Sequence, residues 1–335
     1  MLFAAGALVP VLLVVIAWKT AQALLLLFAG YLLALFLRAP TDLMARRTRL
    51  SHVPAFTLVL VGLLGLAVGT GFWLAPRLAE QVQELSQQLP EAFRNLIGQV
   101  DDQWWFQRAG DRIGPVGGEG GVSWMQRALG IFSTAAGAVT GVLIVLWAGI
   151  YFAATPKRYT EGLLQLVPPE RRGHVADVLG RTDSKLRQWM VGKVLAMAIV
   201  GVLSWVGLAA LGIPLAFTLA VIAALLTFIP NFGPIASTIP PALLALAQSP
   251  IKALWVVLLF LAIQGVESYL LTPMIQEEAI EMPPGLLLAS QIVFALLFGF
   301  MGVVVATPLM AALLVLVRGF YVEDVLEASA APGRE

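Results

Sequence analysis

Cysteine is absent from this chain, and histidine occurs only at His52 and His174 among its 335 residues. The absence of cysteine excludes disulfides, thiolate metal sites and cysteine nucleophiles. The two histidines lie far apart in the sequence, so a histidine metal site has no support. We therefore expect neither a metal centre nor a cofactor.

Common enzyme motifs are also missing. The sequence contains no HExxH, GxSxG, GxxxxGKS or GxxxxGKT motif, which removes the usual metalloprotease, serine hydrolase and ATPase interpretations. The glycine-rich run at residues 114–121 is not followed by Lys-Ser or Lys-Thr, so it is typical of a flexible loop rather than a phosphate site. We expect no enzymatic activity, and any active transport must depend on an ion gradient or a partner.

Charge is scarce as well. Charged residues make up 12% of the chain and hydrophobic residues 59%, whereas a soluble domain carries about 25% charged residues. The mean hydropathy is +0.87. The net charge of +1 gives no excess that would favour nucleic acid. These values predict an all-α polytopic membrane protein with about eight transmembrane helices, partnered by membrane lipids and by no nucleic acid.

The first apolar runs predict three membrane spans. Met1–Trp18 and Ala21–Leu37 are separated only by two polar residues and are expected to form a helical hairpin, followed by a third span over Pro54–Ala75. No basic region precedes the first run, which favours a retained span over a cleaved signal peptide. The loop Arg38–His52 holds four arginines and one acid, so the positive-inside rule places it, and with it the N-terminus, in the cytoplasm.

The longest polar segment follows the third span. Residues 77–127 contain five basic and seven acidic side chains and are expected outside the cytoplasm. Their apolar spacing predicts two amphipathic helices, the second starting after Pro90, with the aromatic residues 104–106 at the membrane surface. We favour a packed cap over a gate or an oligomer contact. The GxxxG match of Gly65 and Gly69 favours packing within the chain over dimerisation.

A fourth span is predicted over Ile131–Ala154, returning to the cytoplasm. Residues 155–191 hold seven basic and four acidic side chains, and their apolar periodicity predicts an interfacial helix that leads into a fifth span over Gly192–Leu211. Lys193 is expected to snorkel to the cytoplasmic interface rather than to form a buried ion pair. Other basic side chains of this helix are expected to be solvated, with anionic lipid as an alternative partner. They are Arg181, Lys185 and Arg187.

The C-terminal half is organised around the stretch Gly212–Pro241. A predicted sixth span stops at Pro230-Asn231-Phe232-Gly233-Pro234, where prolines and glycine forbid a continuous helix. The next apolar run, Ile235–Ala247, is too short to span and reads as half of a re-entrant hairpin. Irregular backbone survives at membrane depth only where protein or water satisfies it, which is typical of a transport site.

A second interruption occurs near the C-terminus. Pro283–Val317 would be about 52 Å long as one helix, so we expect it to be broken or folded back at Gly299–Gly302. Pro214 to Gly233 and Pro283 to Gly302 share one spacing, which points to a weak internal repeat. The expected hinge and helix-break positions are Pro230, Gly233, Pro234, Pro273, Gly299, Gly302 and Pro308.

Glu267 is the one acid inside the predicted seventh span, Ala253–Leu271, which we expect to run outward to an acidic loop. An ionised carboxylate within a membrane is costly and is by default a functional candidate, unless it reaches water at the outer end of its helix. Gln264 and Ser268 share its helix face and can converge with it on a polar ligand or cation. The further polar candidates are Asn231 and Gln291, each of which can instead cap backbone.

The C-terminal half contains a characteristic series of motifs: GIP at 212–214, FIPNFGPI at 228–235, QGVES at 264–268, PPGLLL at 283–288 and GFMGVVVATPLMA at 299–311. In these motifs it resembles the autoinducer-2 exporter family of bacterial membrane transporters. The first 190 residues match only in layout. Lys193 departs from the pattern, in which glutamine follows the glycine. The resemblance implies a homo-oligomeric permease of the bacterial inner membrane, with members linked to autoinducer-2 export and others to sodium/proton exchange.

The hypothesis is a secondary transporter that exports a small polar solute by alternating access, with Glu267 as the proton or cation carboxylate. A sodium/proton antiporter and a non-transporting membrane scaffold or regulator are the alternatives, whereas the spans hold too few polar residues for an ion channel. The expected division is 1–75 (three spans), 76–130 (extracytoplasmic helices), 131–191 (fourth span and cytoplasmic helix), 192–320 (transport core) and 321–335 (tail).

Overall fold

The computed structural model describes residues 2–100, 135–271, 273 and 282–327, and every regular element in these ranges is a helix. The expected all-α class is confirmed. The chain divides into two compact units. Unit 1 comprises residues 1–61, 136–191 and 278–335, and unit 2 comprises residues 62–135 and 192–277.

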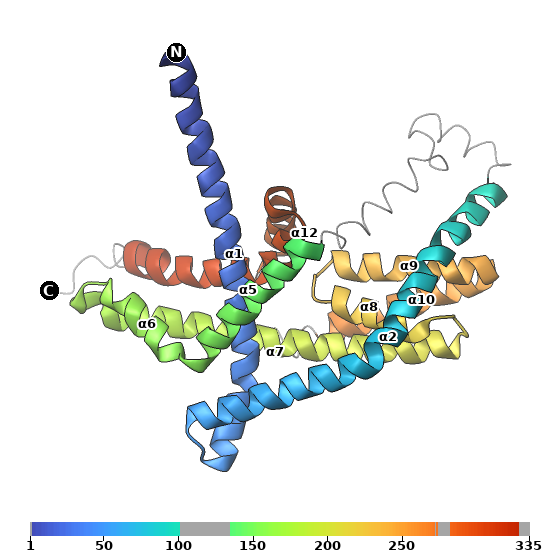
Figure 1. The fold of residues 1–335 in the computed structure, drawn as a ribbon, viewed down its shortest axis with the longest axis horizontal. Coiled ribbons are helices and arrows are strands. Elements are labelled where there is room, and N and C mark those ends of the chain that lie inside the picture. The colour runs from blue at the N-terminus through green and yellow to red at the C-terminus, as the bar shows by residue number, and fades with distance from the viewer. Residues whose placement is uncertain (1, 101–134, 272, 274–281, 328–335) are drawn as a thin grey trace. The chain divides into compact units, whose positions relative to one another are not determined.

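The two N-terminal helices are longer than the sequence predicted. Helix α1 runs without a break over Leu2–Thr48, and α2 runs over His52–Val100 (Figure 1). The predicted hairpin at Lys19-Thr20 is therefore wrong, because neither residue is a proline or glycine that would end a helix. The two separate amphipathic helices predicted around Pro90 are likewise one helix up to residue 100. The aromatic residues 104–106 lie outside the described part of the chain.

Unit 1 contains a close contact between α1 and α5, which spans Ala135–Ala154. A Cβ added to Gly30 would lie 2.6 Å from Ala148 Cβ, and one added to Gly149 would lie 2.8 Å from Leu33 Cδ2. Small residues thus let these two helices approach, as in other membrane helix pairs. By contrast, a Cβ at Gly65 or Gly69 would meet no described atom within 4 Å, so the predicted packing of that motif is not seen.

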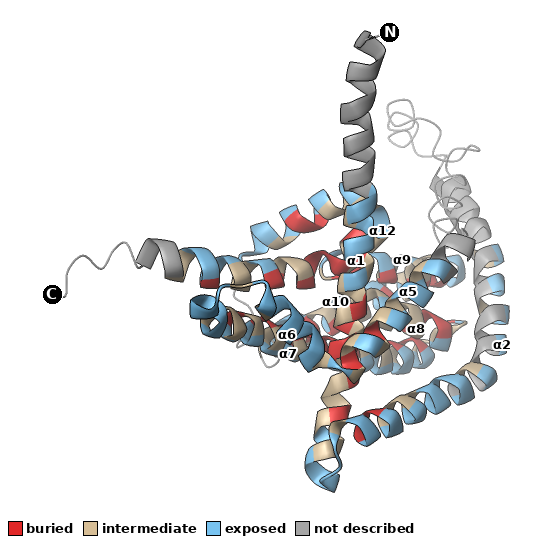
Figure 2. Ribbon diagram, turned by 60° about the vertical axis from the view of Figure 1, so that its left-hand side comes forward, coloured by how far each residue is buried: buried red, intermediate tan, exposed pale blue. Residues whose placement is uncertain are grey.

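Helix α6, Pro156–Gln165, follows α5 at a bend of 85°, and a short 3-10 turn, η1 (Pro169–Arg171), leads into α7 (Arg172–Ala210). Helix α7 begins in unit 1 and continues in unit 2, so the predicted interfacial helix and fifth span form one helix. Its predicted apolar face is buried in the unit 1 part, as the burial colours of Figure 2 show. The buried residues of this face are Val178, Thr182, Leu186, Trp189 and Met190.

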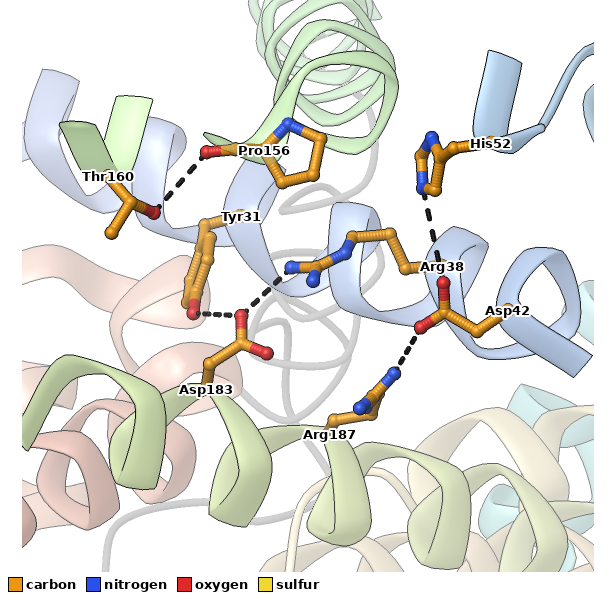
Figure 3. A network of polar contacts seen from close by, with 8 residues as sticks. All are labelled: Tyr31, Arg38, Asp42, His52, Pro156, Thr160, Asp183 and Arg187. Carbon is orange, nitrogen blue, oxygen red and sulfur yellow. Dashed lines mark hydrogen bonds and ion pairs between the residues drawn. The ribbon is translucent and has the colours of Figure 1, made fainter. Parts of the chain in front are cut away.

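Reciprocal charges join α1 to α7 within unit 1 (Figure 3). Arg38 of α1 donates to Asp183 of α7 over 2.9 Å, and Asp183 also accepts from the Tyr31 hydroxyl at 2.9 Å. One turn further along both helices the signs reverse, because Arg187 of α7 donates to Asp42 of α1. Arg187 is thus paired within the protein, which corrects its expected role as a solvated or lipid-facing charge.

The last helices form a folded-back segment. Helix α12, Pro284–Val317, has a non-helical residue at Gly299, with φ of 62° and ψ of −145°. The Gln291 side chain reaches Thr307 Oγ1 at 3.5 Å, although 16 residues of straight helix would separate them by about 24 Å. The predicted fold-back of this segment is therefore confirmed. A π-helix, η3 (Arg318–Glu327), follows, and its Glu323 accepts two hydrogen bonds of 2.9 Å from Arg181 of α7.

Unit 2 contains the later parts of α2 and α7 and three further helices, α8 (Ala216–Leu226), α9 (Phe232–Gln248) and α10 (Pro250–Val266), followed by a π-turn, η2 (Glu267–Leu271). A buried apolar core lies between α7, α8, α9 and α10. It comprises Leu208, Ile213, Leu219, Ala223, Leu244, Ala245, Val256 and Phe260. With only 11 residues, α8 is about 16 Å long, so the predicted sixth span is instead the first half of a hairpin with α9.

The helix directions in unit 2 correct the predicted topology. Lys193 of α7 contacts Glu267 at the end of α10, whereas Gly207, further along α7, lies against Leu259, earlier in α10. The second part of α7 and α10 are therefore antiparallel (Figure 1). If α7 leaves the cytoplasm, α10 returns to it, because the α8–α9 hairpin enters and leaves on one side. The prediction that the fifth and seventh spans run in the same direction is therefore wrong, whereas the direction of each helix through a membrane stays a prediction.

By length and composition alone, five described helices can cross a membrane, or six if the bent pair α5 and α6 forms one span. The stretches are Lys19–Thr48, His52–Gly69, Pro169–Ala210, Pro250–Leu271 and Pro284–Glu323, with Thr140–Ala154 and Pro156–Gln165 as the bent pair. The membrane class is confirmed. The count of eight stays a prediction.

Both helix breaks depend on a glycine that packs against a carbonyl. A Cβ at Gly233 would lie 1.9 Å from Leu226 O, and a Cβ at Gly302 would lie 2.0 Å from Phe294 O. In each case the second helix of the hairpin starts against the end of the first. The two segments that share the proline-to-glycine spacing in the sequence therefore also share this local geometry.

We expect Gly233→Ala and Gly302→Ala to destabilise the protein by about 3 kcal/mol or more, since backbone cannot give way to the new methyl group. The thermal unfolding midpoint of the purified protein in detergent measures this. Gly265→Ala and Gly285→Ala are the matched controls, because an added Cβ at either position meets nothing within 4 Å. Equal midpoints for Gly233→Ala and Gly265→Ala would show that the hairpin geometry is wrong.

Candidate functional site

The candidate site in unit 2 is a buried ion pair. Lys193 Nζ lies 3.1 Å from Glu267 Oε1, and the side chains are only 4% and 10% exposed. Lys193 lies in α7 and Glu267 follows the last residue of α10, so two helices each contribute one charge. Both residues are buried as a whole, not only at their side-chain tips.

Burying two charges is costly. The loss of hydration amounts to several kcal/mol for each ion even after relaxation, and mutual attraction offsets it only when the geometry is good. A cation within hydrogen-bonding distance of the carboxylate provides that geometry here. The structure therefore corrects the expectation that Lys193 snorkels to the interface: its ammonium is directed to Glu267 and lies away from solvent.

The backbone changes its hydrogen-bonding pattern at the acid. Helix α10 is α-helical up to Val266, and Glu267 starts the π-turn η2. Single π-turns inside helices are rare and occur frequently at functional sites, because the wider turn redirects side chains. Here the α-to-π change coincides with the one buried acid of unit 2's described residues.

The π-turn also alters the predicted neighbours of Glu267. Gln264 Nε2 donates to Ser268 Oγ over 3.0 Å, and this pair lies at the exposed side of the helix. Glu267 is buried, whereas Ser268 is exposed. The structure thus joins Gln264 with Ser268 and pairs Glu267 with Lys193, rather than gathering all three on one face. Their predicted role in binding stays a prediction.

The break between α8 and α9 lies in the same unit. Asn231 has a left-handed φ of 65° and precedes α9, but its side chain makes no capping hydrogen bond. Pro230 and Pro234 flank the turn, and Gly233 N donates to Ile229 O at 3.0 Å. Because α8 and α9 both have their other ends in the apolar core, this turn and the ion pair lie toward the same end of unit 2.

Several hydroxyl groups are buried in this unit. Thr227 donates to Ala223 O at 2.8 Å and Ser237 to Pro234 O at 3.0 Å, so both satisfy backbone near the break. Ser204 of α7 differs, because its Oγ is buried and has no hydrogen-bond partner among the described residues. Ser204 lies 11 residues after Lys193 and thus on the same face of α7. Such an unsatisfied group marks a position where water or a solute can bind.

The remaining predicted residues are placed as follows. Gln291 is fully buried inside the α12 hairpin of unit 1, where it contacts Thr307, and Ser290 donates to Leu287 O. Pro308 is buried in the second half of the same hairpin. Pro273 lies just after η2 and is partly buried. Gln291 and Glu267 therefore belong to different units.

No group of three or more His, Asp or Glu side chains among the described residues is arranged to hold a metal ion. Two features escaped the sequence analysis: the partner of Glu267 and the reciprocal charges between α1 and α7. The single lysine within the predicted fifth span, Lys193, was the signal from which the partner of Glu267 could have been predicted. A basic residue inside a span requires an acid, and Glu267 was the one acid within the apolar spans that followed.

Comparison with known proteins covers nearly the whole chain. A family model described as AI-2E family transporter matches residues 8–321. A transport protein of Thermotoga maritima is 24% identical over 255 residues, which cover 75% of each protein. YrrI of Bacillus subtilis, named as a transport protein, is 28% identical over 46% of this chain and 44% of its own length. PerM of Escherichia coli K12, named as a permease, is 29% identical over 50% of this chain and 48% of its own. The chain thus spans about half the length of the last two relatives.

We expect Glu267→Gln to lower the free energy of unfolding by about 3–5 kcal/mol, because it leaves a buried ammonium without its counterion. Lys193→Gln is expected to cost less, since the remaining carboxylate can become neutral by taking up a proton. The double variant removes both charges and is expected to regain most of the stability. Unfolding midpoints in detergent measure all three. Additive losses in the double variant would show that the two residues do not interact.

Proposed function

The chain belongs to the AI-2E transporter family, and from this premise we propose that it is a secondary transporter that exports a small polar solute by alternating access. Export is coupled to a proton or cation gradient through Glu267. Autoinducer-2 is the candidate solute that the family name supplies. The proposed setting is the bacterial inner membrane with a cytoplasmic N-terminus, and the working form is a homo-oligomer.

The observation that carries the proposal is the buried pair of Lys193 and Glu267 at the α-to-π change of α10. A carboxylate that is held ionised inside a membrane protein can accept a proton or a small cation when its partner moves away. Its position toward the same end of unit 2 as the α8–α9 turn supports a role in transport, because interrupted helices commonly line transport sites.

Each polar candidate then has a proposed role. Glu267 binds the coupling ion, and the amide and hydroxyl groups of Gln264, Ser268 and Asn231 in the same unit bind the solute. Gln291 is proposed to bind solute within unit 1. The hydroxyl group of Ser204 is a further candidate, since it has unused hydrogen-bonding capacity in a buried position. The two glycine-based turns serve as hinges between half-helices.

Two alternatives remain distinguishable. A sodium/proton antiporter would use the same carboxylate with no organic solute. A membrane scaffold or regulator would need the ion pair for stability alone, so replacing both charges together would leave its function intact. The buried pair favours transport over the scaffold, because an apolar pair of similar size would stabilise the fold equally well or better.

We expect purified wild-type protein in proteoliposomes to move solute or cations when a proton or sodium gradient is imposed, and Glu267→Gln to abolish the dependence on the gradient. Autoinducer-2 efflux and a pH-sensitive dye inside the vesicles are followed together. Dye response without solute movement would identify the antiporter.

The controls separate coupling from folding. Glu80→Gln removes an exposed carboxylate of the same unit and should transport like wild type. The variant Lys193→Gln/Glu267→Gln should fold yet remain uncoupled. Gradient-dependent transport by this double variant would contradict the role assigned to Glu267.

A further inference from the structure

We propose that Lys193 is a tethered counter-cation: its ammonium occupies the place at Glu267 that the coupling ion takes during transport, so ion and lysine compete for one carboxylate. This inference rests on the proposed function. It adds that Lys193 competes with the coupling ion and so lowers the affinity of Glu267 for that ion. Lys193 is thereby a positioning residue that acts through Glu267.

The first support is the geometry of the contact. Lys193 Nζ reaches Glu267 Oε1 at 3.1 Å by direct contact. The two groups are thus within hydrogen-bonding distance, so the ammonium occupies a position at Oε1 that a bound cation would otherwise take. The lysine is the more deeply buried of the two side chains, at 4% exposure against 10%.

The second support is the charge balance of the pair. One carboxylate balances one positive charge, and the other described charged side chains of unit 2, Glu80, Glu84 and Lys252, are not buried. A second cation beside Glu267 would therefore repel the lysine strongly in this environment of low dielectric constant. Either the ion stays out or the ammonium leaves the carboxylate. Binding of the ion and release of Lys193 are thus one event.

The third support is the backbone around Glu267. The acid lies in a π-turn, and a return to α-helical geometry would rotate its side chain relative to α7. The lysine side chain is long and flexible. A change of backbone geometry at Glu267 is therefore the movement by which we propose that the pair separates. The charge of the site stays constant when a proton or sodium ion replaces the ammonium at Glu267.

The test measures ion binding to the purified full-length protein in detergent. Thermal unfolding midpoints are recorded against sodium, lithium and potassium chloride, at constant ionic strength with choline chloride, and against pH. We expect Lys193→Gln to bind the stabilising ion at least tenfold more tightly than wild type. Lys193→Arg, which keeps the charge, should resemble wild type. Lys252→Gln is the matched control, since it removes an unburied lysine of the same unit.

A second readout separates this role from mere stabilisation. In proteoliposomes the KM for the coupling ion should fall at least tenfold in Lys193→Gln, whereas the KM for solute should stay unchanged. If Lys193→Gln does not fold, Lys193→His gives the comparison within one protein, because imidazole loses its charge near neutral pH. Sodium or lithium should then bind more tightly above that pH than below it.

Failure of this inference and failure of the proposed function give different results. Equal ion affinities in wild type, Lys193→Gln and Lys252→Gln would overturn the tethered counter-cation, even if transport is coupled through Glu267. Tighter ion binding in Lys193→Gln without transport by any variant would support the competition and overturn the transporter. If no ion or pH change stabilises any variant, the inference is overturned.

Discussion

Two opposite charges buried between apolar helices form the central interaction of unit 2. Lys193 and Glu267 are both buried and lie 3.1 Å apart. Neither charge is tolerable alone in an environment of low dielectric constant. The contact of Lys193 with Glu267, together with that of Gly207 with Leu259, shows that α7 and α10 lie antiparallel. The short helix α8 and helix α9 form a hairpin between them.

The hairpin between these helices and the hairpin of α12 follow a common physical rule. Each reverses direction inside an apolar sequence, which leaves backbone groups that need partners. In each break a glycine lies directly against the carbonyl of the preceding half-helix, Gly233 at Leu226 and Gly302 at Phe294, which lets the two halves approach closely. Hydrogen bonds then satisfy groups near the turns: Gly233 N donates to Ile229 O, and Gln291 donates to Thr307. The role of these breaks as hinges stays a prediction.

Sequence reasoning predicted the membrane class, the broken helices and the fold-back near Gly299, because apolar length and the positions of proline and glycine directly limit helices. It missed the features that depend on contacts between residues far apart in the sequence. The hairpin expected at Lys19-Thr20 did not form, since polar residues alone do not end a helix. The direction of α10 and the partner of Glu267 also escaped, because burial of a charge depends on another helix about 70 residues away. The same holds for Arg187, whose partner Asp42 lies on α1.

In the proposed cycle Glu267 is an ionised carboxylate that exchanges Lys193 for the coupling ion. Infrared difference spectroscopy of the protein in lipid, before and after addition of that ion, observes this group directly. We expect the carboxylate stretching bands to change on ion addition in wild type, and this change to be absent in Glu267→Gln. Identical difference spectra for the two proteins would contradict it, because the responding carboxylate would then lie elsewhere.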